Sequence, residues 1–195
     1  MADVKQLVYD LETTGVLTHK HGIHQFSGII LINGKVEEQF NFRMRPNPKA
    51  QIDEEALAVS NVTKEQILSY EMDMYGGYRE LIKLNEKYCD RYKKWDKFHL
   101  VGYNNRNFDD QFLRGLFLQC GDEYFGSWYW ADSIDVMILA SDYLRYERHK
   151  MENFKLVTVA KYLGLTVDET QLHDAHYDLY LTLQIYEIVK RNKPQ

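Results

Sequence analysis

A short apolar segment that ends in two acids constrains this chain more than any other feature. Residues 7–11 have the apolar character of a buried strand, and Asp10 and Glu12 lie near its end. Residues two apart on a strand share a face, so both carboxylates point to one side of the expected sheet. Residues 13–15 then end the strand. Burial of two neighbouring carboxylates is costly, so the segment indicates a cation or proton-transfer site, or else an ordinary strand end with solvated acids.

The residues that follow predict an α/β fold. Residues 26–32 and 35–44 have strand character, and Asn33-Gly34 between them favours a two-residue hairpin turn. Another short strand is expected at residues 98–103. Helices are expected to begin near Asp53 and near Thr63, and another is expected to end at Leu144. Further helices are expected over residues 78–95, 111–119, 154–163 and 174–190. Strands followed by helices, with one strand between helices, favour a mixed sheet.

Length and composition fit a single domain over residues 1–195. The chain is 45% hydrophobic, which is enough for one core, and no linker or repeat interrupts it. Its apolar runs are too short to span a membrane, and the N-terminus has no apolar signal segment. Cys89 and Cys120 offer neither a disulfide framework nor a metal-binding spacing. We therefore predict a cytoplasmic protein without membrane association.

The net charge of −5 argues against broad wrapping of a long duplex. It does not argue against nucleic acid in general, because acids that bind metal ions are neutralised by those ions. Two segments have alternative interpretations. The expected helix at residues 78–95 has a basic face that either contacts phosphate or is simply solvated. The aromatic residues at 124–130 either pack locally or form a surface for a base or a partner.

Acids recur in two later segments. Asp109 follows the strand at residues 98–103 and opens a helix, with Asp110 as its neighbour. Asp174 and Asp178 are four apart at the start of the last helix, so they share a helical face, and His173 precedes them. Helix capping is the alternative explanation for each of these acids taken alone.

Taken together, these segments resemble the DEDDh group of 3′–5′ exonucleases, the DnaQ-like branch that includes polymerase proofreading subunits. The motifs of the group are matched, in order, by Asp10 and Glu12, by Asn104, Phe108 and Asp109, and by His173, Ala175 and Asp178. The resemblance extends over residues 5–190. It implies a ribonuclease H-like fold, in which a mixed β-sheet is flanked by helices on both faces.

The resemblance also implies a metal site. Asp10, Glu12, Asp109 and Asp178 would hold two Mg²⁺ or Mn²⁺ ions, since ligand sets made only of oxygen select hard cations. His173 would be the general base, with His176 as its rival. The residues expected to contact the 3′ nucleotide are Thr13, Thr14, Val16 or Leu17, and Asn104.

The implied activity is that of a metal-dependent 3′–5′ exonuclease, a hydrolase releasing nucleoside 5′-monophosphates from single-stranded or frayed DNA ends. An exoribonuclease with the same chemistry is an alternative, with DNA favoured over RNA. A non-catalytic module that binds nucleic acid or a polymerase is another. The presence of all the catalytic-type residues argues against that module. The expected partner is a nucleic acid 3′ end, with a polymerase or a second copy of the chain as further candidates.

Overall fold

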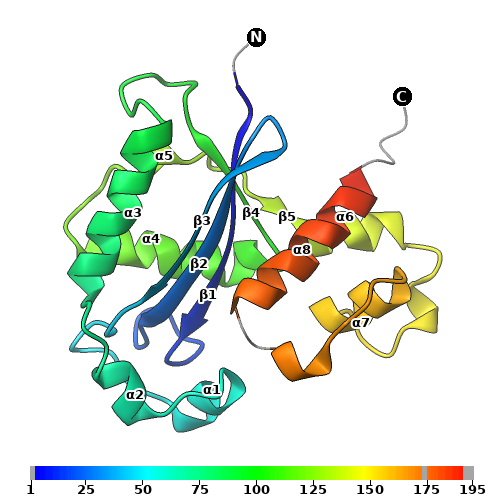
Figure 1. The fold of residues 1–195 in the computed structure, drawn as a ribbon, viewed down its shortest axis with the longest axis horizontal. Helices are drawn as coiled ribbons and strands as arrows, with labels where there is room; N and C mark the ends of the chain where they lie inside the picture. Colours follow the sequence, from blue (N-terminus) through cyan, green and yellow to red (C-terminus); the bar gives the residue numbers. More distant parts are fainter. Residues whose placement is uncertain (1–2, 173–174, 191–195) are drawn as a thin grey trace.

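A computed structural model describes residues 3–172 and 175–190. Its centre is a five-stranded sheet in the order β3-β2-β1-β4-β5 (Figure 1). The strands are β1 (Lys5–Thr13), β2 (Ile23–Ile32), β3 (Lys35–Arg43), β4 (Phe98–Gly102) and β5 (Ile134–Asp135). β1 pairs antiparallel with β2 and parallel with β4, and β4 pairs parallel with β5. The sheet is therefore mixed, as predicted.

Helices cover both faces of this sheet (Figure 1). The α-helices are α1 (Glu54–Val59), α2 (Lys64–Leu68), α3 (Met74–Tyr88), α4 (Asp109–Gln119), α5 (Phe125–Trp128), α6 (Val136–Tyr143), α7 (Leu156–Tyr162) and α8 (Ala175–Lys190). Short 3₁₀ helices are η1 (Asn105–Asn107), η2 (Arg148–Lys150) and η3 (Glu169–Gln171). α3 and α4 lie on one side of the sheet, and α6, α7 and α8 lie on the other. This arrangement confirms the predicted fold class.

The alternation of side chains along β1 separates two hydrophobic cores. Tyr9 and Leu11 join the core on the side of α3 and α4, whereas Val8 joins the core on the side of α6, α7 and α8. Asp10 and Glu12 follow Val8, so they also face the α8 side. The sequence pattern of β1 thus decides where the acids point.

The hairpin between β2 and β3 turns where the sequence predicts it. Asn33 and Gly34 both have positive φ angles, 52° and 79°, as a two-residue hairpin turn of the primed type requires. β2 is buried along almost its whole length. It therefore forms the inner strand beside β1, while β3 is the exposed edge.

The helix predicted at residues 78–95 is wrong beyond Tyr88. α3 ends there, and Cys89 takes up an extended conformation. The next residues form turns that are held by the carboxylate of Asp96, which accepts hydrogen bonds from the N–H of Asp90 and from the ammonium group of Lys5. These contacts depend on the sheet, so local helical spacing could not reveal them. In the part of the chain that the structure describes, no helix is long and apolar enough to cross a membrane.

Candidate active site

The first two acids lie on one face of β1 toward its carboxyl end. Asp10 is opposite Ser27 of β2, and Glu12 is opposite Gln25. Both acids are partly exposed. The carboxylate of Glu12 accepts a hydrogen bond from the hydroxyl of Ser60, just after α1. The α1 region is thereby tied to the end of β1.

The third acid reaches the same edge of the sheet from α4. Asp109 is the first residue of this helix and is only 5% exposed. Its Oδ1 accepts a hydrogen bond of 3.1 Å from the backbone N–H of Leu11. Because β1 and β4 are parallel, their carboxyl ends lie at the same end of the sheet. The chain leaving β4 therefore places Asp109 beside β1.

The fourth acid comes from α8, and electrostatics shows that all four lie close together. The pKa of Asp10 is raised well above its usual value, first by burial and then by the charges of Asp109, Glu12 and Asp178. The pKa of Asp109 is raised to about 8, mainly by burial, although the N–H groups that it accepts from oppose the rise. Carboxylates from β1, α4 and α8 therefore converge and repel one another.

The donor set suits a hard divalent cation, because each of these groups offers only carboxylate oxygen. Among the described residues, no group of three His, Cys, Asp or Glu side chains already has the arrangement of a metal site. Instead, the carboxylate of Glu12 accepts a hydrogen bond from Ser60, and that of Asp109 accepts one from the backbone of Leu11. Their mutual repulsion is nevertheless the property that a cation would relieve.

The two threonines at the end of β1 use their hydroxyls in hydrogen bonds to backbone carbonyls. The hydroxyl of Thr13 donates to the carbonyl of Gly15 over 2.8 Å, and that of Thr14 donates to the carbonyl of Gln51 over 2.6 Å. Val16 and Leu17 project from the loop, with 70% and 41% of their surfaces exposed. The two apolar side chains are thus accessible, as are His19 and Lys20 in the same loop.

Asn104 holds the turn between β4 and η1. It has a left-handed conformation with φ of 61°, and its N–H donates to Asp135 Oδ1 over 3.1 Å. Asp135 also caps α6. His173 lies outside the described residues. Its rival His176 stacks its ring on Tyr180, with 5.3 Å between the ring centroids.

Comparison with known proteins bears directly on this arrangement. Residues 7–74, which include β1 and its two acids, match the family model RNase_T, described as an exonuclease. The matched part of the chain thus resembles an exonuclease domain. This match agrees with the resemblance that the order of the acidic motifs along the sequence indicates.

Curated relatives resemble nearly the whole chain. A PolC-type DNA polymerase III of Ureaplasma parvum is 24% identical over 187 residues, which cover 95% of this chain and 11% of the polymerase. An exodeoxyribonuclease I of Buchnera aphidicola is 26% identical over 212 residues, which cover 99% of this chain and 41% of that enzyme. The chain therefore spans less than half the length of these relatives.

Solved structures share the fold. Exonuclease I of E. coli in complex with a dT13 oligonucleotide superposes with a TM-score of 0.76 and 21% identity, over 96% of this chain and 41% of that one. A zinc-bound form of the same enzyme with single-stranded DNA gives a TM-score of 0.77, also at 21% identity. The similarity confirms the ribonuclease H-like architecture of the chain.

One residue at the site has a part that sequence reasoning missed. Asp110 is buried, and its carboxylate accepts hydrogen bonds from the hydroxyls of Tyr9 and Ser133, each over 2.5 Å, and from Asn105 Nδ2 over 3.1 Å. Adjacent helical residues point in different directions, and Tyr9 is on the opposite face of β1 from Asp10. Asp110 thus fastens the start of α4 to β1, while Asp109 turns toward the other acids.

Proposed function

We propose that this chain is a metal-dependent 3′–5′ exonuclease acting on single-stranded or frayed DNA ends. The observation that carries the proposal is the convergence of Asp10, Glu12, Asp109 and Asp178. The charges of the other three acids raise the pKa of Asp10, and the charge of Glu12 raises the pKa of Asp109. The match of residues 7–74 to an exonuclease family model supports the same conclusion.

The four carboxylates would hold two Mg²⁺ or Mn²⁺ ions. Such ions, when bound, supply an acidified water and neutralise charge on the departing 3′ oxygen. His173, by its place in the family motif, would accept the proton of the attacking water. The stacking of His176 on Tyr180 favours a structural part for that second histidine. The zinc-bound relative supports a requirement for a divalent ion.

The loop after β1 would meet the terminal nucleotide through its apolar tip. Thr13 and Thr14 would shape the loop, because their hydroxyls already bond to the backbone carbonyls of Gly15 and Gln51. Val16 and Leu17 would pack against the 3′ base, since both side chains are exposed. Asn104 would brace the pocket through its bond to Asp135.

DNA is the favoured substrate because the matched relative is named exodeoxyribonuclease I, and the matched structures hold deoxyribonucleotide strands. The products would be nucleoside 5′-monophosphates and a chain shortened from its 3′ end. The PolC-type relatives favour action beside a polymerase as a second context.

The test is digestion of 5′-labelled DNA and RNA oligonucleotides of one sequence, with Mg²⁺ or with EDTA. We expect a metal-dependent ladder that shortens from the 3′ end, faster on DNA. A faster ladder on RNA would replace this proposal with the exoribonuclease. An intact substrate with Mg²⁺ and with Mn²⁺ would contradict the enzyme and favour the non-catalytic module.

A further inference from the structure

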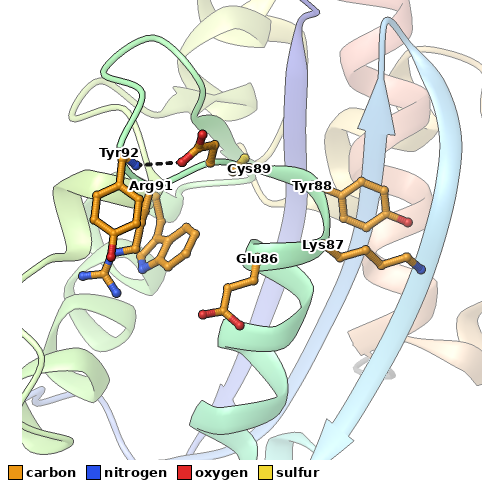
Figure 2. Close-up of a pocket in the computed structure, with 8 residues that line it drawn as sticks. Glu86, Lys87, Tyr88, Cys89, Arg91 and Tyr92 are labelled. Carbon is orange, nitrogen blue, oxygen red and sulfur yellow. Dashed lines mark hydrogen bonds between the residues drawn. The ribbon is translucent and has the colours of Figure 1, made fainter.

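Two features that the proposed catalytic site does not use come together at the opposite end of the sheet. The loop that follows α3 carries basic residues of the segment 78–95, and the turn before α5 carries Tyr124, the first residue of the aromatic segment 124–130. They meet at a surface pocket of about 450 Å³, lined by Glu86, Lys87, Tyr88, Cys89, Asp90, Arg91, Tyr92 and Trp128 (Figure 2). The pocket lies beside the start of β1, because Lys5 binds both Tyr88 O and Asp96 there.

Arg91 is the central group of this pocket. Its guanidinium lies 5.8 Å from the ring centroid of Tyr92 and 5.2 Å from those of Tyr124 and Trp128. Within residues 3–172 and 175–190, no carboxylate forms an ion pair with it. Figure 2 shows Arg91 and Tyr92 extending on one side of the end of α3, with Lys87 and Tyr88 on the other. Lys87 and Tyr88 both donate hydrogen bonds to the carboxylate of Glu38.

Two of the three aromatic rings around Arg91 are open to solvent, whereas the third, that of Trp128, is buried. Tyr92 is 88% exposed, Tyr124 is 62% exposed, and Trp95 in the same loop is 66% exposed. Residues 86–97 contain five lysines or arginines against three acids, a local excess of positive charge in a chain whose net charge is −5. Exposed aromatic faces combined with unpaired cations are the usual means of binding single-stranded nucleic acid without regard to sequence.

We propose that the surface formed by Arg91, Tyr92, Lys94, Trp95 and Tyr124 is a second contact for the substrate strand, upstream of its 3′ end. The inference rests on the proposed function. Bases would stack on the exposed rings, and Arg91 and Lys94 would meet phosphates. An acidic protein tail would pair with the cations but would leave the exposed rings unused, so a single strand fits the surface better.

The position of this surface sets a length requirement. From Lys5 to Glu12, β1 extends about 23 Å at about 3.3 Å per residue. A stacked strand rises about 3.4 Å per nucleotide, so roughly seven nucleotides or more must separate the two sites. The path is longer still because the pocket borders the α3 side of the sheet and the acids face the α8 side. Only a long strand can occupy both sites, and it then gains affinity through effective concentration.

The experiment measures the binding of labelled oligothymidylates of about 4 and about 16 nucleotides, which bracket common single-strand site sizes. EDTA removes divalent metal ions, so binding is measured without hydrolysis of the strand. We expect the wild type to bind the long strand more tightly, and Tyr92→Ala to lower the ratio of long-strand to short-strand affinity by at least about fivefold, the effect of losing one stacked base. Arg91→Gln should also reduce the slope of the logarithm of the long-strand binding constant against the logarithm of the salt concentration by about 0.7.

Tyr75→Ala is the matched control, because Tyr75 is an exposed tyrosine of α3 outside this surface. Its affinity ratio should equal that of the wild type. The inference is overturned if Tyr92→Ala has the same ratio as Tyr75→Ala, if it weakens short and long strands equally, or if polyglutamate quenches Trp95 fluorescence while the long strand does not. Failure of the proposed function shows separately, as an absent digestion ladder.

Discussion

The hydrogen bond from Tyr9 to Asp110 allows one prediction to be worked out in detail. Burial, above all, raises the pKa of Tyr9 well above 10, so its hydroxyl stays protonated and donates to the carboxylate. Tyr9→Phe removes this donor and leaves the ring, which packs 5.8 Å from that of Phe26, in place. A hydrogen bond to a charged group contributes about 1.5–3 kcal/mol, and Asn105 and Ser133 still satisfy the carboxylate. We expect the free energy of unfolding to fall by about 2 kcal/mol.

Urea unfolding in EDTA measures this change, and a loss of about 2 kcal/mol should lower Tm by about 4–8 °C for a chain of this size. Tyr129→Phe is the matched control, since Tyr129 is also buried but bonds to the neutral amide of Asn85. A double-mutant cycle of Tyr9→Phe with Asp110→Asn should give a coupling of about 1 kcal/mol or more. Strict additivity, or a loss no larger than in Tyr129→Phe, would refute the reasoning.

Three further predictions follow from the acids and the histidines. Asp10→Asn should raise Tm in EDTA by about 2–4 °C, because it relieves repulsion among the carboxylates. The same change should lower the rate of hydrolysis at least about 100-fold. A lower Tm would contradict the expected relief of repulsion. Burial lowers the pKa of His24 to about 4, so the unfolded chain takes up its proton below about pH 6.5 and the folded chain does not. Stability should therefore fall by up to about 3 kcal/mol between pH 6.5 and 4, and His24→Leu should flatten that part of the urea-midpoint profile. His173→Ala should abolish most turnover without weakening Mn²⁺ binding, and the reverse result with His176→Ala would reassign the base.

The sequence predicted the acid pair of the site because its geometry is local to one strand. Alternation along β1 determines that Asp10 and Glu12 share a face, and that property survives any packing of the helices. The approach of Asp109 to this pair was implied by the family resemblance, and in the structure it follows from the parallel pairing of β1 with β4. The hairpin at Asn33 was equally local, because only a few residue types accept its positive φ.

The end of α3 and the surroundings of Asp110 could not be predicted in the same way. The apolar spacing up to Trp95 is helical, but the chain leaves the helix at Cys89 because Lys5 and Asp96 fasten the loop to the sheet. Asp110 acquires its environment only when α4 packs on β1. Both features depend on contacts between residues that lie far apart in sequence.

The aromatic segment divides between the two interpretations that the sequence offered. Phe125, Trp128 and Tyr129 are buried in the core next to Phe117, so local packing is confirmed for them. Tyr124 remains exposed beside Arg91. Burial could not be assigned residue by residue from the sequence, because every ring in the segment is similarly apolar.

Calorimetric titration of Mn²⁺ into the metal-free protein tests most directly whether Asp10, Glu12, Asp109 and Asp178 form one cation site. We expect the wild type to bind Mn²⁺, and Asp10→Asn and Asp178→Asn to bind it at least about 10–100-fold more weakly. Asp142→Asn, which changes an exposed acid far from these carboxylates in sequence, should bind like the wild type. Absence of binding to the wild type, or equal binding by all four proteins, would contradict the account.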